Sequence, residues 1–162
     1  MLSFQTSGYQ FHLRAAAVVI HDGAVLLHRA EADDFWALPG GRVDAGEDAA
    51  SAVAREMAEE VSETVACREL LLVVENFFSH QGRRHHEVGL YFKAELPFGS
   101  RLLDKTHSHS GTEPGYSLEY RWFELAGLGG IDIRPRLLQA CLSSELKALK
   151  HVVQKDGVVP AA

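Results

Sequence analysis

Short apolar runs separated by turn residues occupy much of the chain. Residues 14–20 contain β-branched side chains and favour a strand. Asp22-Gly23 is typical of a hairpin turn, so residues 24–28 are predicted to form the partner strand. Further strand-like runs are found at residues 69–78, 87–95 and 120–124.

Two longer segments repeat apolar residues every four positions, as one face of a helix does. Residues 47–61 have this spacing among alanines that favour helix. Residues 136–153 have it again, with Pro135 near the start. The two stripes consist of Val53, Met57 and Val61, and of Leu138, Leu142, Leu146, Leu149 and Val153.

The order of these elements is strands, helix, strands, helix, which predicts a mixed sheet with helices on its faces. Residues 97–116 are polar and rich in Gly, Ser and His, which indicates a long loop. The tail from Gln154 is expected to fray. The chain has 162 residues and no internal repeat, so we predict a single domain over residues 1–162 with a core at about 13–150.

Composition narrows the functional classes. No apolar run reaches the roughly 20 residues that cross a bilayer, and the first ten residues lack the layout of a signal peptide. We therefore expect a cytoplasmic protein without membrane contact. The net charge of −6 disfavours binding of extended nucleic acid, which needs a basic face. It leaves room for a small phosphorylated substrate, because a metal ion can bridge carboxylates to phosphates.

Cys67 and Cys141 are the only cysteines in the sequence. They have no metal-ligand spacing and form no disulfide framework. Free thiols packed in the interior are the expected outcome.

Three glutamates crowd one face of the first predicted helix. Glu56, Glu59 and Glu60 stand at i, i+3 and i+4, where like charges repel. A divalent cation would turn this repulsion into coordination, and carboxylates suit Mg²⁺ or Mn²⁺. Arg55 lies beside them and can brace a glutamate by a bidentate pair. Taken alone, such a cluster is more often a solvated acidic surface.

The surrounding residues favour the metal site. A glycine is followed after five residues by Glu, and after seven more by Arg-Glu-apolar-x-Glu-Glu. The residues at these positions are Gly41, Glu47, Arg55, Glu56, Met57, Glu59 and Glu60. The segment resembles the Nudix box. Residues 36–41 resemble the usual approach to that box, and residues 120–125 resemble the strand before the last helix of the family.

Two positions depart from the family pattern. Ser62 stands where the box has Gly, and Glu63 stands where it has an apolar residue. The glycine ends the helix in a left-handed conformation. Either Ser62 adopts that conformation, or the helix continues and brings Glu63 near the other carboxylates.

The resemblance implies an α/β/α sandwich around a mixed sheet with two main helices. It also implies a hydrolase that cuts a nucleoside diphosphate joined to a group X, with Mg²⁺ (or Mn²⁺) as cofactor. Glu59 and Glu60 would be the main metal ligands, with the carbonyl of Gly40 as a further one. Glu56 would bind metal or help deprotonate the attacking water. Arg55 and Glu47 would orient these groups as catalytic partners.

Members of the family often take another carboxylate from outside the box. Glu87 is the first candidate here, and Glu113 and Glu119 are alternatives. Substrate contacts are expected from Trp36, Arg29 and Gly41. Trp36 is a candidate for stacking on a base, although aromatic residues more often pack in the core, and the same choice applies to Phe77 and Phe78. Five of the nine histidines form a group without a zinc-binding pair on a helix, and we expect them at loop positions, some in contact with phosphate. They are His80, His85, His86, His107 and His109.

Other functions remain open at this stage. A Nudix fold that holds a nucleotide without cleaving it would lack a metal glutamate, whereas the three glutamates of the box are present. An oligomeric scaffold using the acidic helix is a second alternative. The leading substrate is a nucleoside triphosphate or an ADP-sugar-like compound, with selectivity set by the loop at residues 97–116. A homodimer is the default expectation for the assembly.

Overall fold

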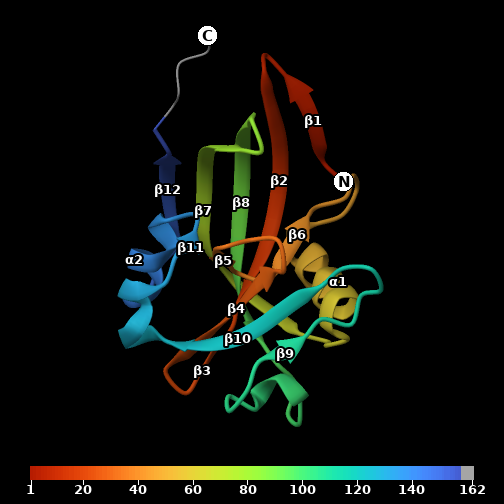
Figure 1. The fold of residues 1–162 in the computed structure, drawn as a ribbon, viewed down its shortest axis with the longest axis vertical. Coiled ribbons are helices and arrows are strands. Elements are labelled where there is room, and N and C mark those ends of the chain that lie inside the picture. The colour runs from red at the N-terminus through yellow and green to blue at the C-terminus, as the bar shows by residue number, and fades with distance from the viewer. Residues whose placement is uncertain (158–162) are drawn as a thin grey trace.

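The computed structural model describes residues 1–157. Two mixed sheets lie between two helices, α1 (Ala49–Val61) and α2 (Leu137–Ser143), as Figure 1 shows. One buried cluster joins both sheets to α1, and a second joins both sheets to α2. The predicted α/β/α arrangement is confirmed, but its β layer consists of two sheets.

The first sheet has the strand order β1-β2-β8-β7-β12, with β6 also paired to β2. The pairs β2–β8 and β7–β12 are parallel, and the other pairs are antiparallel. Its strands are β1 (Ser3–Thr6), β2 (Tyr9–Val18), β6 (Gly40–Arg42), β7 (Ala66–His80), β8 (Arg83–Glu95) and β12 (Lys150–Lys155).

The second sheet has the order β11-β5-β4-β10-β9, with β3 paired to β4. Only the pair β11–β5 is parallel among the pairs described for this sheet. Its strands are β3 (Ile20–His21), β4 (Ala24–Ala30), β5 (Trp36–Ala37), β9 (His109–Ser110), β10 (Leu118–Glu124) and β11 (Ile133–Arg134). Two 3₁₀ turns, η1 (Arg101–Leu103) and η2 (Leu125–Gly130), complete the elements.

The predicted hairpin between residues 14–20 and 24–28 forms only in part. β2 pairs with β8 in the first sheet, and only the short β3 pairs with β4 across the Asp22-Gly23 turn. Both turn residues have positive φ, as expected for a two-residue hairpin. The apolar run at Ala15–Val18 is buried on both faces, which explains its lack of alternation.

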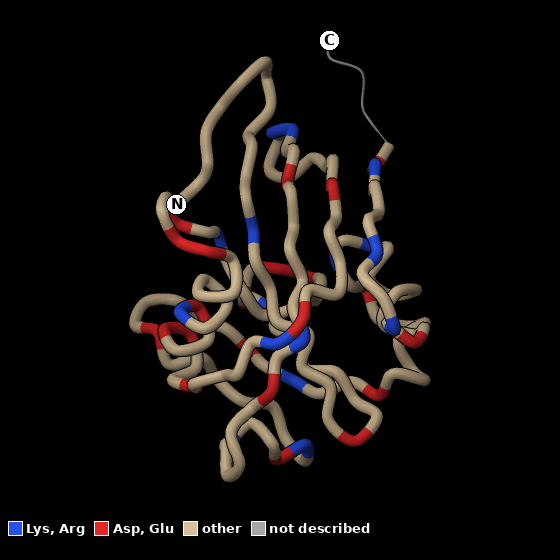
Figure 2. The backbone as a smooth tube through the Cα atoms, turned by 180° about the vertical axis from the view of Figure 1, so that it is seen from behind, with Lys and Arg blue, Asp and Glu red and all other residues tan. Residues whose placement is uncertain are grey.

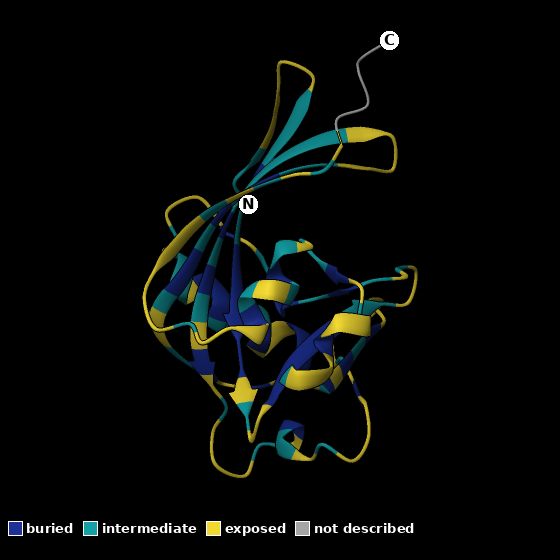
Figure 3. Ribbon diagram, turned by 90° about the vertical axis from the view of Figure 1, so that its left-hand side faces the viewer, coloured by how far each residue is buried: buried dark blue, intermediate teal, exposed yellow. Residues whose placement is uncertain are grey.

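Two hairpins extend beyond the body of the molecule and are less buried than the strands below them (Figure 3). They join β1 to β2 and β7 to β8. Ser7-Gly8 and Gln81-Gly82 form their turns, again with positive φ at both residues. The sequence prediction contained the second hairpin in shortened form and omitted β1.

The second predicted helix is mostly wrong. α2 ends at Ser143, and Lys150–Lys155 forms the strand β12 beside β7. The side-chain hydroxyls of Ser143 and Ser144 bond to the backbone oxygens of Gln139 and Cys141, a local pattern that competes with helix. Leu149 and Val153, assigned to the helix face, are exposed.

The expected fraying from Gln154 is wrong for Gln154 and Lys155, which belong to β12. The rest of that prediction falls partly on residues 158–162, which lie outside the described residues. Cys67 and Cys141 are free and half-buried. No helix within residues 1–157 has the length and apolar character needed to cross a membrane.

Candidate active site

Helix α1 begins two residues later than the sequence predicted, and this delay matters for Glu47. Asp48 caps the helix by accepting a hydrogen bond from the Ser51 amide at 3.0 Å. Glu47 therefore lies outside the helix, in the turn before it. One of its carboxylate oxygens accepts from the Asp44 amide at 3.0 Å, which fixes the turn.

Arg55 connects the acidic residues of the segment. Its Nε and Nη2 donate to the two carboxylate oxygens of Glu47 at 2.9 and 3.0 Å, a bidentate pair. Its Nη1 donates to Glu56 at 2.9 Å and to Glu59 at 3.2 Å. Its Nη2 also reaches the backbone oxygen of Arg42 at 3.1 Å. One guanidinium thus neutralises part of the charge of three carboxylates and ties the helix to β6.

Glu56 is a half-buried carboxylate of this group. Burial raises the pKa of its carboxyl above the ordinary value, and the charges of Glu60 and Glu59 act in the same direction, against the pairing with Arg55. A Cβ at Gly41 would collide with the Glu56 carboxylate, so a larger residue at this position of β6 would displace that side chain. The pairing with Arg55 holds the pKa of Glu47 below its ordinary value.

Glu60 occupies a different environment, buried to 8% exposure. The Tyr120 hydroxyl donates to its Oε2, and His28 Nδ1 lies 3.5 Å from the same oxygen. Burial favours the neutral acid, but the interactions with His28 and Tyr120 outweigh it and lower the pKa of Glu60. Burial and the Glu60 charge in turn raise the pKa of Tyr120 far above its ordinary range.

The helix ends as the family pattern requires, although the glycine is absent. Ser62 adopts the left-handed conformation with φ 58°, and its amide bonds to the Ala58 oxygen at 3.1 Å. Its hydroxyl lies 2.9 Å from that of Thr112. Glu63 turns away from the other carboxylates and accepts from the Ser100 hydroxyl at 2.6 Å. The alternative of a longer helix with a fourth carboxylate in the site is wrong.

A pocket of about 320 Å³ opens between the two sheets beside the C-terminal end of α1. The sequence candidates that line it are Gly40, Glu60, Arg29, Glu87, Phe78 and His80. The other residues of the box, Gly41, Glu47, Arg55, Glu56 and Glu59, are not part of its lining. It is also lined by residues that sequence reasoning did not assign to the site, foremost Arg14, His28, Phe35 and Asn76. Arg14 and His28 carried a usable signal, because a polar residue beside an apolar strand run indicates a special role.

Trp36 does not line the pocket. It is buried in the core on the α2 side, with its ring 4.7 Å from Phe123 and under the Arg29 guanidinium. Phe78 lines the pocket and stacks on His85 at 4.7 Å, while Phe77 stacks on His86.

The other acidic and histidine candidates lie partly at the pocket and partly outside it. Glu119 pairs with Arg29 at 2.9 Å, and Glu113 is exposed in the loop before β10. His80 lines the pocket, whereas His107 and His109 lie together on the loop, away from it. Of the loop at residues 97–116, only Tyr116 lines the pocket, and Leu102 is buried against Trp122.

The donor set suits a hard divalent cation, because every candidate ligand is an oxygen. Glu56 and Glu59 are paired with Arg55, and Glu60 is paired with Tyr120. As these side chains stand, residues 1–157 contain no group of three His, Cys, Asp or Glu side chains arranged to hold a metal. Figure 2 shows acidic and basic residues close together in this part of the molecule.

Gly40 adjoins the carboxylates for a backbone reason. Its φ is +146°, and a Cβ there would collide with the backbone of Ala15. Glycine alone lets β6 approach β2 this closely, with Ala16 opposite Gly40. The close approach places Gly40 in the wall of the pocket together with Glu60.

Comparison with known proteins agrees with this geometry. The family model described as NUDIX domain matches residues 11–140. A Nudix hydrolase structure from Nitrosomonas europaea aligns with TM-score 0.63 and 21% identity, covering 90% of this chain and 79% of the other. An ADP-ribose pyrophosphatase from Streptococcus suis 89-1591 aligns with TM-score 0.60 and 16% identity, covering 88% and 98%.

A MutT Nudix hydrolase from Burkholderia pseudomallei aligns with TM-score 0.57 and 25% identity, covering 83% of this chain and 99% of the other. No curated protein matches the chain. The three solved structures share its fold.

Proposed function

Because the chain belongs to the Nudix family, we propose that it is a divalent-cation-dependent hydrolase that splits the diphosphate linkage of a small nucleotide. The proposed substrate is a nucleoside triphosphate or an ADP-sugar-like compound. One observation carries the proposal: α1 presents Glu56, Glu59 and Glu60 on one face, and Glu60 shares a pocket with Gly40. Cytoplasmic location and a homodimer stay predictions from the sequence.

The proposed ligands of the cation are Glu59, Glu60 and the carbonyl of Gly40, with Glu56 bound directly or through water. Bound Mg²⁺ would neutralise charge on the diphosphate and favour ionisation of the attacking water. Glu87 lines the same pocket from β8 and is the proposed additional carboxylate.

The chain's own residues supply the remaining steps. The raised pKa of Glu56 suits a group that accepts a proton from water. Arg55 keeps that carboxylate in place through Nη1. Arg14 and Arg29 line the pocket and would bind phosphate oxygens, since guanidinium groups match phosphate geometry. Gly41 leaves room for Glu56, and Trp36 acts by supporting Arg29 from below.

A nucleotide-binding module without catalysis is the second candidate. The presence of Glu56, Glu59 and Glu60, with the Arg55 network around them, argues against it, because a fold that only binds a nucleotide has no need for a complete set of metal glutamates. The two functions differ in product formation.

The test is product analysis with a panel of nucleoside triphosphates, nucleotide sugars and dinucleoside polyphosphates, in Mg²⁺ and in EDTA. Wild type is compared with Glu59→Gln, and Glu145→Gln, an exposed glutamate outside the site, is the control. We expect Mg²⁺-dependent cleavage by wild type and by the control. The cleavage rate of Glu59→Gln should fall more than about 100-fold, which exceeds the loss typical of a residue that only contacts a metal ligand.

Cleavage that persists in EDTA would contradict the role of the cation. Binding of a nucleotide without cleavage of any compound would establish the non-catalytic alternative. Equal activity of Glu59→Gln and wild type would remove Glu59 from the site.

A further inference from the structure

We propose that Tyr120 and His28 are positioning residues that hold Oε2 of Glu60 and leave Oε1 as the oxygen offered to the cation. This inference rests on the proposed function, because it concerns the same metal site. It gives a role to a buried tyrosine and a buried histidine outside the box.

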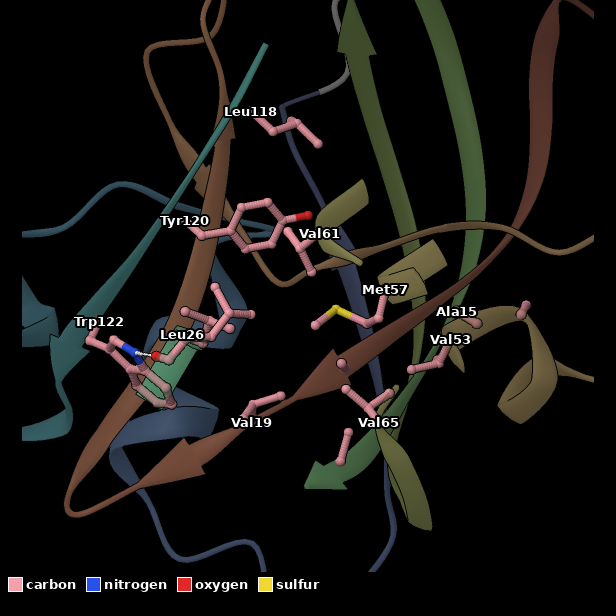
Figure 4. Packing of buried hydrophobic residues seen from close by; sticks show 14 of the residues in the cluster. Ala15, Val19, Leu26, Val53, Met57, Val61, Val65, Leu118, Tyr120 and Trp122 are labelled. Atoms are coloured by element: carbon pink, nitrogen blue, oxygen red, sulfur yellow. Dashed lines mark hydrogen bonds between the residues drawn. The ribbon is translucent and has the colours of Figure 1, made fainter. Parts of the chain in front are cut away.

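The two residues form one structural unit. Tyr120 on β10 stands directly opposite His28 on β4, and their ring centroids are 5.4 Å apart. Tyr120 is fully buried, and Figure 4 shows its hydroxyl directed toward α1. A side chain held by close packing in the core cannot change rotamer easily. The position of the hydroxyl, and hence of the oxygen it contacts, is therefore fixed by the second sheet.

His28 adds an unsatisfied atom to this unit. Its Nδ1 is fully buried and has no hydrogen-bond partner among the described residues. The nearest acidic atom is Oε2 of Glu60, 3.5 Å away. A buried polar atom without a partner is costly, so its persistence indicates a function. Both neighbours approach the same carboxylate oxygen, and Oε1 is left without either contact.

The partners of Glu60 also differ in charge from those of Glu56 and Glu59. A guanidinium holds those two glutamates, whereas the Tyr120 hydroxyl is a neutral donor to Glu60. A neutral donor orients a carboxylate without cancelling its charge, so the tyrosine hydroxyl leaves that charge available to a cation. Outer partners of this kind fix a ligand in the geometry that the metal requires.

The experiment measures Mn²⁺ binding directly, from the electron paramagnetic resonance signal of free Mn²⁺, with the full chain and without substrate. Tyr120→Phe removes the hydroxyl and keeps the ring. Tyr91→Phe is the matched control, because Tyr91 is also buried and, within residues 1–157, forms no hydrogen bond with Glu60. We expect Tyr120→Phe to bind Mn²⁺ about 10- to 100-fold more weakly. Tyr91→Phe should stay within about twofold of wild type.

A second pair of variants tests the proposal independently, even if Tyr120→Phe does not fold. His28→Asn keeps a polar atom near the place of Nδ1, and His28→Leu removes it. Asn should retain more Mn²⁺ affinity than Leu, and near-ultraviolet circular dichroism checks that each variant is folded.

Unchanged Mn²⁺ affinity in Tyr120→Phe, or equal affinity in the two His28 variants, would overturn the positioning role while the proposed hydrolase stood. Wild-type protein that binds no Mn²⁺ would overturn both. Binding by wild type without any cleavage would refute only the catalytic proposal.

Discussion

The carboxylates of α1 and of the turn before it are stabilised in two different ways, at an Arg55 end and at a Glu60 end. Glu47, Glu56 and Glu59 surround a charged and partly exposed guanidinium. Glu60 is buried and contacts a tyrosine and a histidine on the second sheet. The first arrangement is local, within one segment of the chain, whereas the second joins residues 60 positions apart.

This difference suggests that the two sets of contacts respond differently when a cation binds. The Arg55 network relieves the repulsion of neighbouring carboxylates and can open when a cation takes over that task. The contacts of Glu60 are set by core packing and can stay in place when a cation binds.

Arg55→Ala should have the largest effect. It leaves three carboxylates without their charge-assisted bonds, so the free energy of unfolding in EDTA should fall by about 1–3 kcal/mol. Cleavage should fall about 100-fold, because the network orients the ligands. Thermal unfolding with and without Mg²⁺, together with product release, checks both.

Mg²⁺ should recover part of the lost stability of Arg55→Ala, since a cation that binds only the folded state stabilises it. If Arg55→Ala lost no activity and no stability, the network would be a surface feature. The activity and stability of Arg55→Lys should lie between those of wild type and Arg55→Ala, because lysine keeps the charge but cannot form the bidentate pair with Glu47.

Gly41→Ala should have a smaller effect on stability and a selective effect on the Arg55 end. The new Cβ collides with the Glu56 carboxylate, a side chain that can move, so we expect a cost of about 1 kcal/mol. Activity should nevertheless fall at least about tenfold, because Glu56 leaves its position. Gly127→Ala, where a Cβ meets open space, is the control.

Activity and Mn²⁺ affinity are measured for both glycine variants. Full activity in Gly41→Ala would show that the position of Glu56 is unimportant for catalysis. An equal loss in Gly127→Ala would point to a general response of the fold.

The smallest effect concerns pH and lies outside the site. Burial, followed by the nearby charges of Arg42, His85 and Arg14, lowers the pKa of His12 from 6.5 to about 4. The unfolded state therefore binds more protons than the folded state, and His12 reduces stability as pH falls from about 6.5 towards 4.

His12→Gln should flatten this part of the stability profile by on the order of 1 kcal/mol, as followed by urea unfolding at pH 7 and pH 5. Glutamine can keep contacts with Ser3 and His85, which bond to His12 at 3.0 and 2.7 Å. An unchanged slope would assign the acid sensitivity to other groups.

The sequence predicted the local end of the site better than the distant end. The spacing identifies part of the network, because Arg55 and Glu56 stand four and three residues before Glu59, where helical side chains meet. The contact between Glu60 and Tyr120 depends on how two sheets pack, and no spacing along the chain encodes it. Tyr120 was assigned to a strand, and its role became visible only in the fold.

The contrast between local spacing and long-range pairing also explains why the prediction for the C-terminal segment was mostly wrong. A four-residue leucine spacing at 138–153 predicted one long helix, yet only Leu137–Ser143 forms it. Lys150–Lys155 instead covers the edge of β7, a long-range pairing that satisfies backbone groups of an otherwise open sheet. The positions of the box glutamates follow from spacing along one helix, whereas the formation of this strand depends on pairing with a distant segment.

The proposed hydrolase activity is tested most simply by ³¹P nuclear magnetic resonance of the wild-type chain with a mixture of ADP-ribose and nucleoside triphosphates. Mg²⁺ is added after a metal-free baseline has been recorded. We expect the signals of at least one intact compound to decay only after Mg²⁺ is added, and EDTA to stop the decay. ADP-ribose would give two monophosphates, and a nucleoside triphosphate would give a nucleoside monophosphate and pyrophosphate. Signals of all the intact compounds in the mixture that persist at stoichiometric protein and millimolar Mg²⁺ would contradict the proposed activity.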